Sequence, residues 1–330
     1  MPADRFGRQI DYLRISVIDH CNLRCVYCMP LRGLHFLPSE QLLSAAEIER
    51  VARAAVSVGF RKFRLTGGEP TLRPDLVDIV RRIAAVPGAL DVAMTTNAVL
   101  LPGLAQPLRA AGLTRLNVHV DSLHPERLKR LMRFGSLSEI EAGIAAAEAA
   151  GLTPIKLNCV VERGVNDHTV VELARRFRGS GHIVRFIEYM DVGTRNAWDL
   201  AKVVPAREIV ERIDAELPLE PAEANYRGEV ARRWRYRDGA GEIGVIASVS
   251  QPFCGDCTRA RLTAEGGFVT CLFAAGGRDL KGPLRAGASD AELLELLAGT
   301  WQRRSDRYSE ERANLPLRAP RRIEMYQVGG

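Results

Sequence analysis

YLRISVIDHCNLRCVYC, residues 12–28, joins a strand pattern to a loop that carries Cys21, Cys25 and Cys28. Its first part alternates apolar and polar side chains, the periodicity of a half-buried strand. The three thiols, called here the first cysteine set, can hold an iron–sulfur cluster, but a full set for a four-iron cluster is four. One iron would keep an open position, where chemistry can take place. The alternative is a zinc or structural site with a fourth ligand from elsewhere, although zinc sites usually show paired two-residue spacings.

A second cysteine set, Cys254, Cys257 and Cys271, has the same deficit of one ligand. One three-cysteine set could arise by chance, but two sets that each lack a fourth ligand indicate a shared function for the open position. Pooling all six cysteines into one cluster or into two zinc sites would leave ligands missing or spare. The seventh cysteine, Cys159, falls in an expected strand, and we interpret it as a small buried hydrophobic residue.

Composition limits the classes of protein that the chain can belong to. It has 330 residues, of which 46% are hydrophobic, enough for a sizeable core. It lacks an apolar run long enough to cross a membrane, and its first residues lack a secretory signal. We therefore expect a cytoplasmic protein, in which clustered cysteines more often bind metal than form disulfides. The mild net charge of +6 suits an anionic small molecule or a weak nucleic-acid contact.

Strand and helix patterns alternate through the first part of the chain. We expect strands over residues 12–18, 62–65, 91–96, 114–120, 153–161 and 182–190, and helices over 44–59, 74–85, 103–111, 137–150 and 167–178. Such alternation indicates βαβ units and a parallel sheet. Six units without a two-fold break predict an α/β fold of the incomplete (β/α)6 type, a partial triose-phosphate-isomerase barrel. The first cysteine set then lies at the carboxyl end of a strand, where barrels place their chemistry.

The pattern changes after about residue 195, so we expect a barrel region over 1–195 and a C-terminal region over 196–330. The C-terminal region is expected to hold a helix over 205–217, strands over 226–236 and 242–249, a hairpin over 263–272, a last helix near 290–303 and an aperiodic tail from 314.

The spacing C-x3-C-x2-C after the first strand resembles the signature of the radical SAM superfamily. Within it, the second cysteine set, the sequence TGGEP at 66–70, the sequence TRAR at 258–261 and the terminal Gly329-Gly330 are similar to one family. That family is the GTP 3′,8-cyclases of molybdenum cofactor biosynthesis, also called the MoaA family. The resemblance covers nearly the whole chain.

The resemblance implies two [4Fe–4S] clusters and S-adenosyl-L-methionine as cofactors. The first cysteine set would hold the cluster that binds S-adenosylmethionine, and the second would hold a cluster that orients guanine. In the family, a 5′-deoxyadenosyl radical abstracts the C3′ hydrogen of GTP, and the C3′ radical attacks guanine C8. The product is (8S)-3′,8-cyclo-7,8-dihydroguanosine 5′-triphosphate, the first intermediate of the molybdenum cofactor.

Further residues match family positions. Tyr27, Gly68, His119 and Met190 match contacts to S-adenosylmethionine, although position 119 is commonly serine in relatives. The positions that match contacts to GTP are Arg14, Arg64, Thr95, Lys156, Arg259, Ala260 and Arg261. Arginine offers a planar fork suited to phosphate oxygens, and no P-loop motif is present to bind them instead.

Further expectations concern the end of the chain, one turn and the partners. Gly329 and Gly330 would reach into the active site and support chemistry that uses no side-chain acid or base. The family's T-T-N-G reads Thr95-Thr96-Asn97-Ala98 here, which we expect to change only the turn. A cyclic pyranopterin monophosphate synthase would take the product, and a donor of the flavodoxin or ferredoxin type would supply electrons. We expect no membrane or nucleic-acid partner, and either a monomer or a homodimer.

Three other functions remain as alternatives. They are a radical SAM enzyme that modifies peptide or RNA, a two-cluster electron carrier, and a zinc-binding nucleic-acid protein. Auxiliary domains of the first usually carry more than three cysteines, and carriers close their clusters with four protein ligands.

Overall fold

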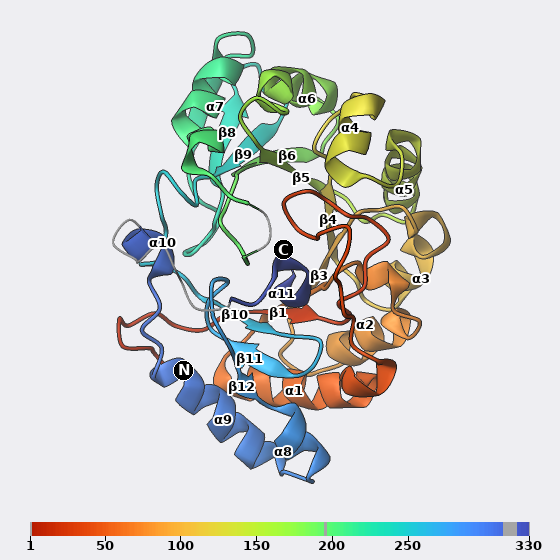
Figure 1. Cartoon of the computed structure of the whole chain (residues 1–330), viewed down its shortest axis with the longest axis vertical. Coiled ribbons are helices and arrows are strands. Elements are labelled where there is room, and N and C mark those ends of the chain that lie inside the picture. Colours follow the sequence, from red (N-terminus) through yellow and green to blue (C-terminus); the bar gives the residue numbers. More distant parts are fainter. Residues whose placement is uncertain (1, 195–196, 313–321, 330) are drawn as a thin grey trace.

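Figure 1 shows a computed structural model of the chain, which describes residues 2–194, 197–312 and 322–329. The strands of these residues form one curved sheet, with helices on its outer side and the described end of the chain near the centre of the curve. The strands are β1 (Tyr12–Ser16), β2 (Lys62–Thr66), β3 (Asp91–Thr96), β4 (Arg115–His119), β5 (Lys156–Val161), β6 (Ile183–Glu188), β7 (Leu219–Ala222), β8 (Arg232–Tyr236), β9 (Glu242–Ile246), β10 (Arg259–Leu262), β11 (Gly267–Val269) and β12 (Arg278–Asp279).

The helices of the described residues alternate with the first six strands and then continue into the C-terminal region. They are α1 (Ala45–Val58), α2 (Leu76–Ala84), α3 (Ala105–Ala110), α4 (Pro125–Met132), α5 (Leu137–Ala149), α6 (Val170–Phe177), α7 (Ala206–Asp214), α8 (Lys281–Arg285), α9 (Asp290–Gln302), α10 (Tyr308–Glu311) and α11 (Met325–Val328). Short 3₁₀ turns cover Ser39–Gln41, Pro70–Leu72, Leu101–Gly103, Asp167–Thr169 and Leu200–Lys202. Within the described ranges, every helix is too short or too polar to cross a bilayer.

Strand order confirms the partial barrel. The sheet runs β12-β11-β10-β1-β2-β3-β4-β5-β6-β9-β8-β7, and the pairs from β10 through β9 are parallel. The first six strands are therefore extended by β10 beside β1 and by β9 beside β6, both from the C-terminal region. Among the named strands of the described residues, the antiparallel pairs lie at the two edges of the sheet. Strands from both sides of the expected boundary near residue 195 therefore belong to the same sheet.

Local sequence explains the most regular helix. Ser44 caps α1 and forms a capping box with Glu47, because each side chain accepts a hydrogen bond from the other residue's amide. The helix ends at Gly59, whose φ of +130° suits glycine. Both limits were predicted from the sequence.

Several helices and strands of the structure were not predicted from the sequence. Helix α4, strand β7 and helix α8 had no prediction, and the strand expected from residue 226 begins only at Arg232. The helix near 290–303 is present as α9 but is not the last, because α10 and α11 follow it. The expectation of an aperiodic tail was therefore wrong for residues 325–328, and its residues 314–321 and 330 lie outside the described ranges.

Candidate active site between the two cysteine sets

One cavity inside the curved sheet brings together most of the residues singled out in the sequence. It is lined by the six cysteines of both sets and by Arg14, Tyr27, Arg64, Gly68, Thr95, His119, Lys156, Met190, Arg259 and Arg261. Ala260 does not line it, because neighbours on a strand face opposite sides, and its methyl group belongs to the hydrophobic core. Only the backbone of Ala260 could contact a ligand in this cavity.

Backbone hydrogen bonds hold the loop of the first cysteine set. The amides of Cys28 and Met29 both donate to the Cys25 carbonyl at 3.0 Å. The amide of Arg24 donates to the carbonyl of Met132, and that of Val26 to the carbonyl of Leu131, both in the last turn of α4. The missed helix α4 therefore supports the loop that carries the three thiols.

Glycines bring the 67–69 turn against the chain that leads into this loop. The amide of Gly68 donates to the Ile18 carbonyl and that of Glu69 to the His20 carbonyl, both at 2.7 Å. A Cβ on Gly68 would overlap the His20 carbonyl oxygen. Position 68 therefore requires glycine for packing of the backbone, whatever ligand binds beside it.

Glu69 was quoted in the sequence but given no role, and the structure assigns it one. Its carboxylate is buried and accepts hydrogen bonds from the hydroxyls of Thr71 and Thr96 at 2.6 and 2.7 Å. It also accepts from the amides of Thr71 and Asn97. Burial raises the pKa of Glu69, although these four donors oppose the shift. Glu69 thus ties the ends of β2 and β3 together beside the first cysteine set.

His119 takes part in a three-residue network. Its Nε2 lies 2.6 Å from the Asp121 carboxylate and also bonds the Tyr27 hydroxyl. The Tyr27 hydroxyl donates to Asp121 at 2.7 Å. The network joins the cysteine loop to the carboxyl end of β4.

Ala98, at the family's glycine position, has a φ of +68°. This left-handed conformation costs an alanine on the order of 1–2 kcal/mol that glycine would avoid. The sequence difference therefore affects the strain at this position.

Burial and nearby carboxylates disfavour thiolates in the first cysteine set. Burial raises the pKa of Cys21 to about 11, and Glu69 adds to the shift. Burial also raises the pKa of Cys25, with contributions from Cys28 and Asp121. The pKa of Cys28 rises for the same reason, together with the charges of Cys21 and Glu324.

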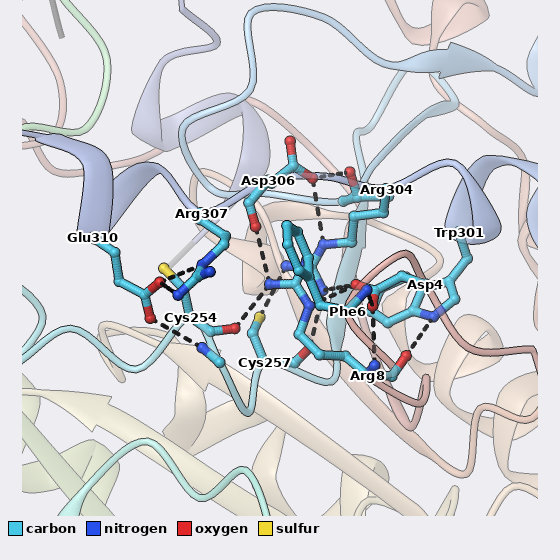
Figure 2. A network of polar contacts seen from close by, with 12 residues as sticks. Asp4, Phe6, Arg8, Cys254, Cys257, Trp301, Arg304, Asp306, Arg307 and Glu310 are labelled. Atoms are coloured by element: carbon cyan, nitrogen blue, oxygen red, sulfur yellow. Dashed lines mark hydrogen bonds and ion pairs between the residues drawn. The ribbon is translucent and has the colours of Figure 1, made fainter. Parts of the chain in front are cut away.

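Arginines surround the second cysteine set. Burial opposes ionisation of Cys257, but Arg259 and Arg304 outweigh it and lower the pKa of this thiol to about 6. Arg304 Nη2 donates to Cys257 Sγ at 3.2 Å (Figure 2). The pKa of Cys271 is raised by burial to about 11.

A row of arginines crosses the cavity floor. Arg14 of β1 is in register with Arg64 of β2 on one side and with Arg261 of β10 on the other. Neighbouring strands lie about 4.8 Å apart, so the three side chains leave the sheet side by side. Arg64 and Arg261 are buried, and no ion pair involves any of the three within the described ranges. Burial lowers the pKa of Arg14 well below its usual range, and Arg261 and Arg64 lower it further.

Two more cations lie on the opposite strands. Arg185 lines the cavity and donates to the Asn158 side-chain oxygen at 3.0 and 2.7 Å. Its pKa is lowered to about 9, first by burial and then by Arg64. The pKa of Lys156 is lowered to about 8, by burial and then by Arg185. Positive charge on both sides, which exceeds that of the lining carboxylates Glu69, Glu229 and Asp306, makes this cavity suited to a highly charged anion.

The described end of the chain reaches this row. Arg261 Nη1 donates to the Val328 carbonyl at 3.0 Å and also bonds the Gly329 carbonyl. Gly329 has a φ of +67°, and a Cβ there would overlap the Thr66 side chain. Gly329 therefore lies beside the cavity, whereas Gly330 lies outside the described residues.

The donor set fits iron–sulfur clusters better than single ions. In the described ranges, no group of three or more His, Cys, Asp or Glu side chains could hold one metal ion. The cysteines of a four-iron cluster bind different irons, so their sulfurs surround a cluster and do not converge on one ion. Each set offers three partly buried thiols around the cavity. The residues present therefore fit one three-cysteine cluster at each set.

Arg185, Arg304 and Asp121 were missed as site residues in the sequence. Arg185 lies on β6 and lines the cavity, so its place in an expected strand was a signal that could have indicated it. Arg304 follows α9, far from either cysteine set in sequence, and no local signal indicates that it reaches Cys257.

The fold and the cavity define a radical SAM protein, and comparisons with known proteins agree. The family model of the radical SAM superfamily matches residues 15–177, and that of Molybdenum Cofactor Synthesis C matches 182–310. A solved structure of Streptococcus suis SuiB bound to its precursor peptide SuiA has a similar fold. Its TM-score is 0.61 at 15% identity, covering 94% of this chain and 68% of that one.

Curated relatives narrow the class to one family. A GTP 3′,8-cyclase of Acidothermus cellulolyticus is 53% identical over 94% of this chain and 88% of its own. A GTP 3′,8-cyclase of Xanthomonas axonopodis pv. citri is 49% identical over 99% of this chain and 98% of its own. The chain belongs to the family of GTP 3′,8-cyclases. Membership in the radical SAM superfamily implies a [4Fe–4S] cluster and S-adenosylmethionine.

Proposed function

We propose that this chain cyclises GTP in the cavity between its two cysteine sets. The observation that carries the proposal is the convergence of six thiols and a row of three arginines on one cavity, with no ion pair to any of the three among the described residues. The first cysteine set would hold the cluster, which with S-adenosylmethionine would supply a 5′-deoxyadenosyl radical to take the C3′ hydrogen of GTP. Addition of C3′ to guanine C8 would open the C8–N7 double bond, and the resulting radical would need one electron from a reductant and one proton to give the cyclised product.

The residues of the chain bind, orient and shield. The first cysteine set would hold the cluster for S-adenosylmethionine, beside Tyr27, Gly68, His119 and Met190. The second cysteine set would hold a second [4Fe–4S] cluster that faces the guanine. Their arrangement around one cavity supports this assignment.

The triphosphate would lie against the cations. Arg14, Arg64 and Arg261 form the row, and Lys156 and Arg185 lie on the opposite strands. A triphosphate would balance the positive charge of this row, and each arginine can donate two parallel hydrogen bonds. Thr95 and Arg259 also line the cavity and stay predicted substrate contacts, as does the backbone of Ala260.

Label transfer tests the proposal. The anaerobically reconstituted protein is incubated with S-adenosylmethionine, a strong reductant and GTP deuterated at C3′, with GTP deuterated at C2′ as the matched control. We expect deuterium in 5′-deoxyadenosine from the first substrate only, together with cyclised GTP. Cleavage of S-adenosylmethionine without label transfer would contradict the proposal. Binding of a peptide or RNA in place of GTP would favour the corresponding modifying enzyme.

The expected partners fit this function. A cyclic pyranopterin monophosphate synthase would consume the product, and a low-potential flavodoxin or ferredoxin would reduce the first cluster. We propose that the protein acts in the cytoplasm as a monomer or a homodimer.

A further inference from the structure

We propose that Arg304 is a positioning residue of the second cysteine set and raises the reduction potential of the cluster bound there. The inference rests on the proposed function, because it requires the second cluster. It concerns a residue outside both cysteine motifs and outside the predicted contacts to GTP.

Arg304 donates hydrogen bonds to two atoms of Cys257. Its Nη1 donates to the Cys257 carbonyl at 2.9 Å, and its Nη2 donates to Cys257 Sγ at 3.2 Å. One planar guanidinium therefore fixes both the backbone and the sulfur of the same ligand, as Figure 2 shows. A lysine could not reproduce this pair, because it offers a point charge without a fork.

The surroundings hold Arg304 in this orientation. Its side chain is 2% exposed and lies between two carboxylates, Asp306 at 3.3 Å and Asp4 at 3.9 Å. Its guanidinium also lies over the Trp301 ring, 4.6 Å from the centroid. Two carboxylates and an aromatic face favour the charged form of a buried arginine, so a full positive charge lies beside Cys257.

The N-terminal segment supports the same loop without touching a sulfur. Arg8 Nη1 donates to the carbonyls of Cys254 and Asp306, at 2.8 and 2.9 Å. Arg8 Nε donates to Asp4 at 2.6 Å, and the Arg8 carbonyl accepts from Trp301 Nε1 at 3.0 Å. Arg8 and Arg304 thus share partners but differ in one respect, because only Arg304 bonds a cysteine sulfur (Figure 2).

This difference has an electronic consequence. Reduction adds negative charge to a cluster, and a hydrogen bond or positive charge at a ligand sulfur stabilises the reduced form. At the first cysteine set the sulfur of Cys21 accepts from the neutral amide of Leu23 at 3.3 Å. The second cluster should therefore be reduced at a higher potential than the first, with Arg304 contributing to the difference.

A redox titration followed by electron paramagnetic resonance tests the proposal. The full chain with Cys21, Cys25 and Cys28 replaced by serine carries only the second cluster. Its midpoint potential is compared in this background with Arg304, Arg304→Gln, Arg304→Lys and Arg8→Gln. Iron and sulfide are counted in every sample.

We expect Arg304→Gln to keep the cluster and to shift its midpoint potential to more negative values. Arg304→Lys should shift it less, because a positive charge remains. Arg8→Gln should shift the midpoint potential less than Arg304→Gln, because it removes a positive charge near the Cys254 carbonyl but no bond to sulfur.

An unchanged midpoint potential in Arg304→Gln would overturn the proposal. So would loss of the cluster in Arg304→Gln together with an unchanged potential in Arg304→Lys, since Arg304 would then act only in holding the loop. A shift in Arg8→Gln as large as that in Arg304→Gln would also overturn it. Absence of iron and sulfide from the parent with Arg304 intact would instead refute the second cluster itself.

Discussion

The first cysteine set lies among carboxylates, whereas the second lies among arginines. Glu69 and Asp121 add to the burial that raises the thiol pKa values around Cys21 and Cys25. Arg259 and Arg304 overcome burial and lower the pKa of Cys257. Cys257 is therefore electrostatically opposite to Cys21 and Cys25, although burial raises the pKa of Cys271 in the second set to about 11. An environment that disfavours added electrons suits a site that must give an electron away, and a cationic one suits a site that binds an anionic nucleotide.

Substitution of one cysteine in each set should have the largest effects and should show that the two sets have different roles. Cys25→Ser should reduce formation of 5′-deoxyadenosine below detection, because the first cluster loses a ligand. Cys257→Ser should abolish cyclised GTP while some cleavage of S-adenosylmethionine persists. Both products are measured by liquid chromatography after anaerobic incubation. If either variant formed cyclised GTP at the rate of the unaltered chain, the roles proposed for the two cysteine sets would be contradicted.

The described end of the chain should affect formation of cyclised GTP and not cleavage of S-adenosylmethionine. Gly329→Ala introduces a Cβ that overlaps Thr66 at a φ of +67°, so the end should be displaced from Arg261. We expect cyclised GTP to fall about tenfold or more, while 5′-deoxyadenosine still forms. Gly287→Ala is the matched control, since its φ is +86° but no atom lies within 4 Å of the new Cβ. Equal effects of the two variants would show that backbone strain alone is responsible.

Removing one charge of the arginine row should weaken binding and stabilise the ligand-free protein. Arg14→Met removes hydrogen bonds to charged phosphate, each about 1.5–3 kcal/mol, so the Kd for GTP should rise about 10- to 100-fold. It also removes a partly buried charge without an ion pair, which should raise the free energy of unfolding by about 1–2 kcal/mol. Calorimetry measures both quantities. The exposed Arg81→Met on α2 should change neither, and a lower Tm for Arg14→Met would contradict this account.

Binding of GTP should weaken in alkaline solution through Lys156. Its pKa in the ligand-free fold is about 8, against an ordinary value of 10.5. The cost of burying the charged lysine is fully present below pH 8 and is relieved as the pH rises from 8 towards 10.5. A bound triphosphate favours the charged form, so binding takes up a proton in this window. Affinity should fall by up to about tenfold per pH unit above pH 8.

Isothermal titration between pH 7 and about 9.5 checks this dependence, and Lys156→Met should flatten it. An equally steep fall in Lys156→Met would assign the titration to another group, such as Arg185, whose pKa is about 9.

The smallest effect is expected at the cysteine that belongs to neither set. Cys159 is buried beside Asn166, and its sulfur lies 3.7 Å from the Asp121 carbonyl oxygen. Cys159→Ala should lower the free energy of unfolding by about 1 kcal/mol, as a small buried truncation does. Iron and sulfide content should not change. A loss of iron would place Cys159 in a cluster and remove the symmetry of the two sets.

The alternation of strands and helices and the cavity residues on strands could be predicted from the sequence. Periodicity marks the six barrel strands, and the cysteine spacings mark the two loops. The addition of β10 and β9 to the sheet could not be predicted, because strand order depends on contacts between distant segments. The roles of Arg304 and Glu69 in the site could not be predicted for the same reason. Their partners lie 47 residues away at Cys257 and 27 residues away at Thr96, and no local pattern records such a contact.

Helix α4 shows a different limit. It is short and polar, with three basic residues in Pro125–Met132, and it lacks a side-chain cap at its beginning. Its stability comes from packing and from the cysteine loop that bonds its last turn. Its sequence does carry helical signals, Pro125 at the first position and buried Leu128, Leu131 and Met132 on one face, but they extend over only about two turns.

The pairing of β10 with β1 has a consequence for synthesis of the chain. The first strand leaves the ribosome early, but its second neighbour, Arg259–Leu262, follows only after most of the protein has been made. The other side of the six strands likewise waits for Glu242–Ile246. During that interval the nascent sheet has two open edges, which can pair with other chains. Chaperone demand should therefore be greatest just before these late strands emerge, and a chain truncated near residue 195 should aggregate.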